Sequence, residues 1–469
     1  MSNYKKNSFW FDTLDDSFIP RESLAGDIDA DVAIVGAGYT GLWTAYYLKR
    51  LKPELNIVIV EAQIAGYGAS GRNGGWVAGS ISGFDRFVKP LALQDKQKAC
   101  ALLASNVDAI GETLAQEGID AHFNKAGVIY AAARYPEQLK QQQAELKELH
   151  ASGYSEADCY WLDKSQLADK VRIRNGLGGI YKRHCATINP ALMVRGLATK
   201  VEQMGVRIYE QTPALSIQAR QLKTAHGQVN ATTIIPAVEG YCSTLKGFGH
   251  YMIPVHSLII ATEPISETIW AEIGLHNREA FSDASRMVTY GHRSQDGRMI
   301  FGSRGGYNYG GVPRSEFSLQ DSEFRQREAI LHDLFPQLKA AKITHGWGGS
   351  LGVARRFAPH VVYDPLTGIG TAGGYGGEGV AASHLFARTL ADLILNRESE
   401  FTQMPWVFKD VDYQQVLKKW EPEPIRWLTS KAISQAFSWE ENLYLNQRSS
   451  GYSKSVANQL SNALSLLMK

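Results

Sequence analysis

Four residues near the start of the chain have the types and spacing needed to hold a dinucleotide. Gly36, Gly38 and Gly41 form a G-x-G-x-x-G pattern, and Glu61 follows the last glycine by about 20 residues. In such a pattern the first glycine makes a tight turn, the second lets the backbone approach a pyrophosphate, and the third lets a helix pack closely on a strand. A carboxylate at the later position can accept hydrogen bonds from a ribose.

The segments around these residues predict a β-α-β unit. Residues 31–35 are a short apolar run rich in β-branched residues, which predicts a strand; residues 42–51 predict a helix; and residues 56–60 predict a second strand that ends on Glu61. The N-terminus of such a helix offers free N–H groups and a positive dipole end to phosphates. A chance match to the glycine pattern is the alternative, and the strand–helix–strand context disfavours it.

A glycine-rich run, residues 66–75, follows Glu61 almost directly. Such a run does not make a stable helix or strand, but it lets backbone come close to a large ligand and donate several N–H bonds. A nicotinamide-dependent dehydrogenase would usually continue here with another β-α-β unit, whereas a protein that holds FAD in an extended form needs a second contact. A flexible surface loop is a further alternative, which the Arg72-Asn73 pair between glycines disfavours.

A third glycine-rich segment lies near the end of the chain. Residues 345–350 precede a strand expected at 368–372, and residues 373–380 then lead into a helix expected to reach Ile394. Negative charge gathers on a flavin ring when it accepts two electrons, and a helix N-terminus aimed there would stabilise that charge by roughly a kcal/mol or two. An ordinary helix with a glycine-rich lead is the alternative.

With these three segments in this order, the chain resembles the D-amino-acid oxidase-like family of FAD-dependent oxidoreductases, in particular the bacterial branch that includes glutamylputrescine oxidoreductase. The likeness rests on the GASGRNGG sequence at 68–75, on W-x-G at Trp347 and on G-Y-x-G-x-G-V at 374–380. It implies non-covalent FAD, because residues 68–75 include no Cys or His. The cofactor-binding residues that it implies are Gly36, Gly38, Tyr39, Thr40, Gly41, Glu61, Ala62, Gly68, Ala69, Ser70, Gly71, Arg72, Asn73, Gly74, Gly75, Ala214, Gly374, Gly376, Gly377, Glu378, Gly379 and Val380.

The resemblance also implies the fold, which is α/β (α+β). A Rossmann-like FAD-binding domain is expected beside a second, mostly antiparallel β-sheet domain for the substrate. We expect the first domain at 28–90, 170–245 and 340–396, the second at 91–169 and 246–339, and a C-terminal helical extension at 397–469. The extension is rich in aromatic residues, and we expect it to pack on the body of the protein; a partner surface is the alternative. Residues 236–240 depart from the family's ATN or ATG sequence.

The chemistry that the resemblance implies is oxidation of a C–N bond in an amine or amino acid. A hydride passes to flavin N5, the imine is hydrolysed to a carbonyl, and oxygen or another acceptor takes the electrons. The alternatives are a hydroxy-acid or polyol dehydrogenase on the same scaffold, and a flavin electron-transfer subunit without its own turnover. The lack of cysteine clusters for iron–sulfur centres disfavours the last.

Substrate contacts are expected from polar residues at strand ends that face the ring. Arg304, expected at the end of a strand at 299–303, could hold a carboxylate or phosphonate bidentately. Each candidate also has a structural alternative: an Arg at a strand end is often a surface ion pair, and a His is often a satisfied hydrogen-bond partner. The other candidates are Tyr375, Trp347, His184, Tyr307 and Arg183.

Composition limits the remaining possibilities. The 469 residues carry a formal net charge of +2, which argues against a dedicated nucleic-acid surface. The four cysteines and twelve histidines show no metal-ligand spacing. The cysteines lie far apart and predict free thiols in a reducing compartment. We see no signal peptide and no apolar run long enough to span a membrane, and we therefore expect a cytoplasmic enzyme.

Overall fold

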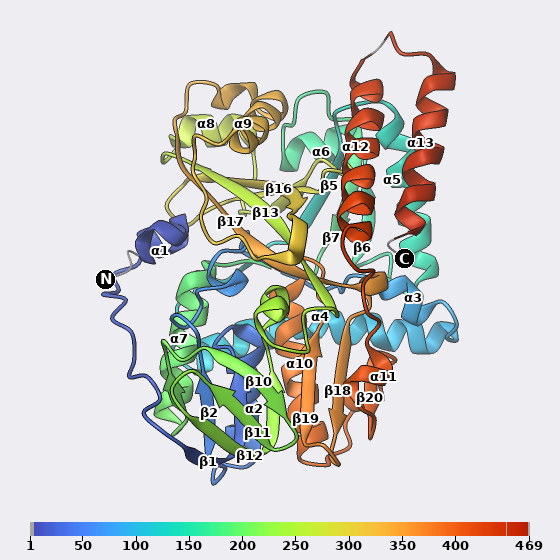
Figure 1. Ribbon diagram of the computed structural model, residues 1–469. Helices are drawn as coiled ribbons and strands as arrows, with labels where there is room; N and C mark the ends of the chain where they lie inside the picture. The colour runs from blue at the N-terminus through green and yellow to red at the C-terminus, as the bar shows by residue number, and fades with distance from the viewer. Residues whose placement is uncertain (1–3, 447, 468–469) are drawn as a thin grey trace.

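The computed structural model describes residues 4–446 and 448–467 and has two main β-sheets, one in each half of the molecule. Figure 1 shows the first sheet in the lower half and the second in the upper half, with the C-terminal helices beside the second. The mixed α/β architecture, with a Rossmann-like unit and a second sheet, is confirmed.

The first sheet contains the predicted β-α-β unit. β1 (Ile28–Val35) and β2 (Ile57–Val60) are parallel neighbours joined by α2 (Tyr39–Leu51), and their buried residues alternate between the two faces of the sheet. The core strands are parallel, whereas β18 runs antiparallel to β19. Along the sheet the order is β20 (Val407–Lys409), β18 (His360–Asp364), β19 (Ile369–Gly373), β12 (Gln228–Pro236), β1 (Ile28–Val35), β2 (Ile57–Val60) and β9 (Arg207–Tyr209).

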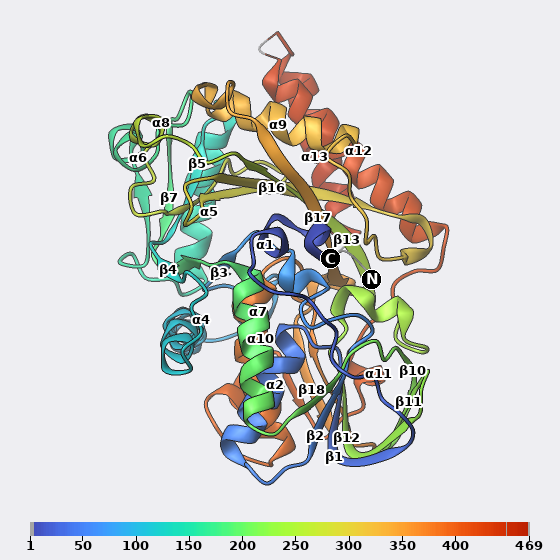
Figure 2. The ribbon, with the colours of Figure 1, turned by 90° about the vertical axis from the view of Figure 1, so that its left-hand side faces the viewer.

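Helices cover one face of this sheet and a β-hairpin covers the other, as Figure 2 shows. The helices α2, α7 and α10 share one apolar core with Ile34 and Ile59, while Leu222 of the hairpin packs with Val35 and Val58 on the opposite face. The elements are α2 (Tyr39–Leu51), α7 (Pro190–Gln203), α10 (Gly379–Ile394), β10 (Ala214–Gln218) and β11 (Gln221–Thr224).

The second sheet is antiparallel except where β14 pairs with β5. One face carries the apolar core that α6 (Lys164–Lys170), α8 (Glu267–Ile273) and α9 (Ser322–Leu334) cover. The opposite face is turned toward the first half of the molecule. The strand order is β17 (Ile343–Ala354), β13 (Met252–Thr262), β16 (Met299–Tyr307), β15 (Thr289–Arg293), β14 (Ala280–Ser282), β5 (Val128–Ala132), β7 (Gly178–Lys182) and β6 (Cys159–Leu162).

Smaller elements join the two halves. A three-stranded antiparallel sheet lies between them, and a short N-terminal helix, α1 (Phe9–Asp12), packs on β17. Near the end of the chain, α12 packs on α13 and on β16. These elements are β3 (Trp76–Ala78), β8 (Cys185–Thr187), β4 (Asn124–Lys125), α3 (Phe84–Val88), α4 (Leu93–Gln116), α5 (Glu137–Ala151), α11 (Tyr413–Val416), α12 (Ile425–Leu445) and α13 (Gly451–Leu466).

Three expectations differ from the structure. β7 lies within 170–245 and β17 within 340–396, segments expected in the FAD-binding domain, but both strands pair in the second sheet. The strand expected to end at Ser303 continues to Tyr307, because Val255 of β13 still pairs with Tyr307. The sequence also predicts a helix over Phe317–Leu334, but the helix begins only at Ser322, because Arg314 stacks on the Phe317 ring and pairs with Asp321, which folds the intervening residues into a loop.

Candidate functional site: a cofactor cavity between the two sheets

A cavity of about 560 Å³ opens where β1, β2 and β12 end. The carboxyl ends of parallel strands are where open α/β sheets bind ligands. All three predicted glycine-rich segments contribute to its wall. Of the predicted cofactor residues, the wall includes Gly36, Gly38, Tyr39, Thr40, Glu61, Ala62, Gly68, Ala69, Ser70, Asn73, Ala214, Gly376, Gly377, Gly379 and Val380.

The first glycines have the conformations that their roles require. Gly36 has a φ of +103°, and a side chain there would place its Cβ 2.8 Å from the Ala237 carbonyl. A Cβ at Gly41 would collide with the Gly36 carbonyl, so Gly41 lines no cavity and instead lets α2 pack on the end of β1. Gly38 stands at the N-cap position of α2, facing Ser70.

Glu61 lies at the end of β2 with its carboxylate fixed by two backbone groups. Its Oε2 accepts a hydrogen bond from Ala37 N at 2.9 Å, and its Oε1 accepts one from Gln63 N at 2.9 Å. Burial raises the pKa of this carboxyl, and the two backbone N–H groups oppose that rise. Since each carboxylate oxygen has a second lone pair, both can still accept from ribose hydroxyls.

Residues 68–75 divide into a cavity wall and a packing surface. A short 3₁₀ turn, Ala69–Gly71, brings the Ser70 Oγ to 2.9 Å from Tyr39 N at the start of α2, where it accepts a hydrogen bond. Gly68, Ala69, Ser70 and Asn73 line the cavity, whereas Gly71, Arg72, Gly74 and Gly75 do not. Gly71, Gly74 and Gly75 lie close against Phe11, Tyr290 and the Ile188 carbonyl, and Arg72 is buried.

Residues far away in the sequence hold this segment in place, and Trp347 is one of them. Its Nε1 donates to the Arg72 carbonyl at 2.9 Å, and the ring is buried beside Phe9 and Trp10, so it does not line the cavity. Trp10 Nε1 donates to the Asn73 carbonyl at 2.8 Å. Sequence reasoning missed this role of α1, whose aromatic run Phe9-Trp10-Phe11 was the available signal.

The third segment closes the cavity at the N-terminus of α10. Tyr375 lines the cavity, and its hydroxyl lies 2.8 Å from Thr40 Oγ1, which joins the third segment to α2. Gly379 and Val380 of the first helical turn reach the wall. Gly374 and Glu378 do not reach it; the carboxyl of Glu378 accepts from Ser80 Oγ at 2.9 Å on the side away from the cavity.

Glu239 is a cavity residue that the sequence interpretation did not single out. It stands in residues 236–240, where the chain departs from the family sequence. Its Oε1 accepts from Gly374 N at 2.8 Å and from Tyr375 N at 3.0 Å. Burial raises the pKa of this carboxyl to about 7, although the two N–H groups favour its ionised form.

Arg304 lies inside β16 on the face turned toward residues 66–75. Alternate residues of a strand share a face, and a Cβ at Gly302 would meet the Tyr290 ring, which itself lies against Gly74. The Arg304 side chain is solvent-exposed, yet the protein around it desolvates the guanidinium and lowers its pKa, with no neighbouring acid to oppose the shift. Arg304 does not line the cofactor cavity.

The other substrate candidates lie apart from the cofactor cavity. His184 lines a second, smaller cavity, where its Nε2 lies 2.9 Å from Asp158 Oδ1. Tyr307 donates to Glu423 at 2.6 Å and packs with the C-terminal extension. Arg183 is exposed.

The cavity suits a cofactor that is long and polar. Ribose, phosphate and ring contacts can be met in turn by Glu61, by the N-terminus of α2 and by the N-terminus of α10. Two buried polar atoms on the wall, Glu239 Oε2 and Tyr241 Oη, have no partner within the described residues. Buried polar atoms without a partner are costly, so these atoms are open to a bound group.

The described residues contain neither a candidate metal site nor a helix that could span a membrane. Within residues 4–446 and 448–467, no group of three or more His, Cys, Asp or Glu side chains could hold a metal ion. No helix in that part of the chain is both long enough and apolar enough to cross a membrane.

The chain is similar to known proteins over most of its length. Residues 31–393 match the family described as FAD dependent oxidoreductase, DAO. The chain is 28% identical to a probable oxidoreductase OrdL of Haemophilus influenzae, over 84% of this chain and 89% of that protein. It is 27% identical to the gamma-glutamylputrescine oxidoreductase of Escherichia coli, over 82% and 88%.

Among solved structures, the glycine oxidase of Geobacillus kaustophilus has a similar fold. The TM-score is 0.66 at 18% sequence identity, over 82% of this chain and 99% of that one. The family match covers most of the chain and includes all three glycine-rich segments, so this protein belongs to the DAO family of FAD-dependent oxidoreductases.

Proposed function

We propose that this enzyme oxidises a C–N bond of an amine or amino acid, with FAD bound non-covalently in the 560 Å³ cavity. The observation that carries the proposal is the convergence of the three glycine-rich segments on one cavity, from Glu61 at one end to the N-terminus of α10 at the other. Two relatives whose names include an amine or amino-acid substrate, gamma-glutamylputrescine oxidoreductase and sarcosine oxidase subunit beta, support the choice of substrate class.

The chain's own residues would bind and orient the cofactor and the substrate rather than transfer protons. Bound FAD supplies the acceptor for the hydride that leaves the carbon next to nitrogen. Glu61 and the start of α2 would anchor the nucleotide end, and the first turn of α10 would offer its positive end to the ring. Tyr290 and Trp76, which pack edge to face at 6.0 Å, would exclude water from the side of the second sheet.

Anaerobic reduction of the purified enzyme tests the proposal. The protein should be yellow, should release intact FAD on acid denaturation, and should lose its yellow absorbance when mixed without oxygen with a member of a panel of amines and amino acids. Bleaching by hydroxy acids or polyols, with no response to any amine, would instead indicate the hydroxy-acid or polyol dehydrogenase. A colourless protein that cannot be reconstituted with FAD would contradict the cofactor assignment.

A further inference from the structure

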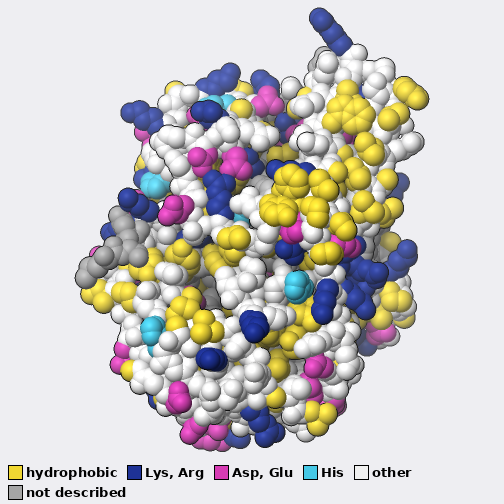
Figure 3. Space-filling view, viewed as in Figure 1, with side chains coloured by type: hydrophobic (Ala, Val, Ile, Leu, Met, Phe, Trp, Pro, Cys, Tyr) yellow, Lys and Arg dark blue, Asp and Glu magenta, His cyan; other side chains and the backbone are white. Residues whose placement is uncertain are grey.

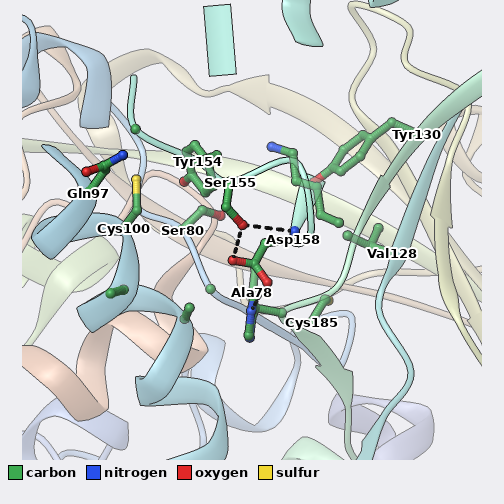
Figure 4. Close-up of a pocket in the computed structure, with 16 residues that line it drawn as sticks. Ala78, Ser80, Gln97, Cys100, Val128, Tyr130, Tyr154, Ser155, Asp158 and Cys185 are labelled. Carbon is green, nitrogen blue, oxygen red and sulfur yellow. Dashed lines mark hydrogen bonds and ion pairs between the residues drawn. The ribbon is translucent and has the colours of Figure 1, made fainter. Parts of the chain in front are cut away.

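The second, smaller cavity is separate from the cofactor cavity. Its volume is about 230 Å³, and Figure 4 shows Cys100 of α4 and Tyr130 of β5 on opposite sides of it. None of the described residues in its wall also lines the cofactor cavity. Access to a bound cofactor therefore depends on the segments in the wall of the larger cavity.

One of these segments belongs to the long connection between β16 and α9. Residues 308–316 of this connection, which we call the wall segment, contribute Val312, Pro313 and Ser315 to the lining of the cofactor cavity. Val312 nevertheless keeps 66% of its surface exposed, so no apolar core fixes it. Long connections with little regular structure of their own are uncommon in compact domains, and many of them are lids or binding loops.

Polar contacts hold the wall segment on the side of the cavity. Arg314 N donates to Ser350 Oγ at 3.1 Å, and Arg72 Nη1 donates to the Ser315 carbonyl at 2.8 Å. Ser350 lines the cavity, and Arg72 belongs to the glycine-rich residues 68–75. A segment with few buried apolar contacts opens at a lower free-energy cost than the core does. The hydrogen bonds of the wall segment therefore decide how often it opens.

Glu423 of the C-terminal extension holds the other end of the wall segment. It lies two residues before α12, and its Oε1 accepts from Tyr307 Oη at 2.6 Å, from Gly310 N at 3.0 Å and from Arg426 Nε at 2.8 Å. Burial alone would raise the pKa of this carboxyl, but the hydrogen bonds from Tyr307 and Arg426 lower it, so the group is ionised at neutral pH. Hydrogen bonds to an ionised group are stronger than those between neutral groups.

Two ring contacts lie at the same junction. Tyr309 of the wall segment packs edge to face on Trp427 with centroids 6.1 Å apart, and the Arg426 guanidinium lies 5.7 Å from the centroid of the Tyr307 ring. Tyr309 remains mostly exposed, so the ring contact buries little of it. The Glu423 carboxylate is therefore the main link between the extension and the wall segment.

We propose that Glu423 is a positioning residue that holds the wall segment closed over the cofactor cavity, so that the C-terminal extension controls the release of FAD. The inference goes beyond the proposed function and rests on its placement of FAD in the 560 Å³ cavity; it does not depend on oxidation of an amine. Without the carboxylate, the hydrogen bonds to Ser350 and from Arg72 alone would hold the segment.

Hydrogen exchange of the FAD-loaded enzyme, read residue by residue by mass spectrometry, tests the proposal. The amide to follow is Arg314 N, which is bonded to Ser350 and not to Glu423, so it exchanges faster only if the whole segment opens. Glu423→Ala should speed its exchange by roughly ten-fold to a hundred-fold, the range for a charged hydrogen bond. FAD leaves from the open state, so its release after dilution, followed by fluorescence, should accelerate by a similar factor.

Glu421→Ala is the matched control. Glu421 lies in the same part of the extension and accepts from Arg355 Nη2 at 2.9 Å, and it has no hydrogen bond to the wall segment as far as the chain is described. Tyr307→Phe removes one donor to Glu423 from the opposite side and should speed both processes in the same direction, so it replaces Glu423→Ala if that variant does not fold. Thermal unfolding and exchange within β13 check that each variant keeps its fold.

Unchanged exchange at Arg314 N in Glu423→Ala and Tyr307→Phe overturns the proposal, and so does an equal acceleration in Glu421→Ala. Faster exchange without faster FAD release also overturns it, because the segment would then open without covering the cofactor. If both rates respond to Glu423 but no amine bleaches the enzyme, the role of Glu423 stands and the amine-oxidising function fails.

Discussion

Glu239 places a carboxyl group on the wall of the cofactor cavity. Its pKa near 7 means that it loses its proton within the physiological range. The native protein thus binds more protons than the unfolded chain between about pH 4.5 and pH 7. The stabilisation that comes from this protonated form is complete below the unfolded pKa and is lost as pH rises through about 7.

This titration should make FAD binding depend on pH. The ionised carboxylate repels the negative phosphates of the cofactor, so the Kd for FAD should rise as pH increases through about 7. Glu239→Gln should bind FAD more tightly than the parent above that pH and should show a flatter profile. Fluorescence titration of the apoprotein measures both, with exposed Glu54→Gln as the control. An identical pH profile in parent and Glu239→Gln would show that another group is responsible.

Glu61 should matter for cofactor affinity and not for the chemical step. It follows β2 directly, with both carboxylate oxygens already oriented by backbone N–H groups. Loss of its charged hydrogen bonds in Glu61→Ala should weaken FAD binding by about 1.5–3 kcal/mol. At saturating FAD, the rate of bleaching by an amine should stay close to that of the parent. Equal FAD affinity in Glu61→Ala and in Glu54→Ala, a control on the preceding exposed turn, would remove Glu61 from the ribose site.

At the scale of elements, the sequence predicts those helices and strands whose ends are set by residues close by in the chain. The spacing of Gly36, Gly38 and Gly41 between two β-branched runs is enough to predict β1, α2 and β2. A tight turn and close helix packing restrict those three positions to glycine. Asn189 and Pro190 likewise mark the start of α7, where the Asn189 side chain accepts from Ala191 N and Leu192 N. These signals lie within a few residues of the elements that they determine.

Contacts between distant segments could not be predicted in the same way. Nothing in the sequence near Trp347 indicates that its indole donates to Arg72, 275 positions away. The membership of β7 and β17 in the second sheet also depends on partners distant in sequence, Val128–Ala132 and Met252–Thr262. Glu239 stood in a segment where the resemblance gave no guide, so its role was visible only from its hydrogen bonds to Gly374 and Tyr375.

At the scale of the whole molecule, the C-terminal extension packs on the half that contains the second sheet. Tyr444 of α12 stacks on Tyr135 with ring centroids 4.8 Å apart, and Trp420 Nε1 donates to the Val353 carbonyl at 2.9 Å. Figure 3 also shows hydrophobic side chains gathered on the outer surface over α12 and α13. The exposed apolar residues there include Ile425, Leu428, Tyr452 and Leu460. The extension thus contributes both to the core and to the surface.

A buried ion cluster joins the extension to the second sheet and should be a point of high sensitivity. Arg134 pairs with Asp283 at 3.3 Å and with Glu441 of α12, and all three side chains are almost fully buried. Removing one partner of a buried pair leaves an uncompensated charge and costs about 3–5 kcal/mol. Arg134→Ala should lower the free energy of unfolding by that amount in urea titration, because Asp283 and Glu441 would be left facing each other.

Lys98→Ala, which breaks an exposed pair with Asp95, is the control and should lower the free energy of unfolding by only about 0–1 kcal/mol. Similar losses in the two variants would show that the cluster does not hold the extension in place.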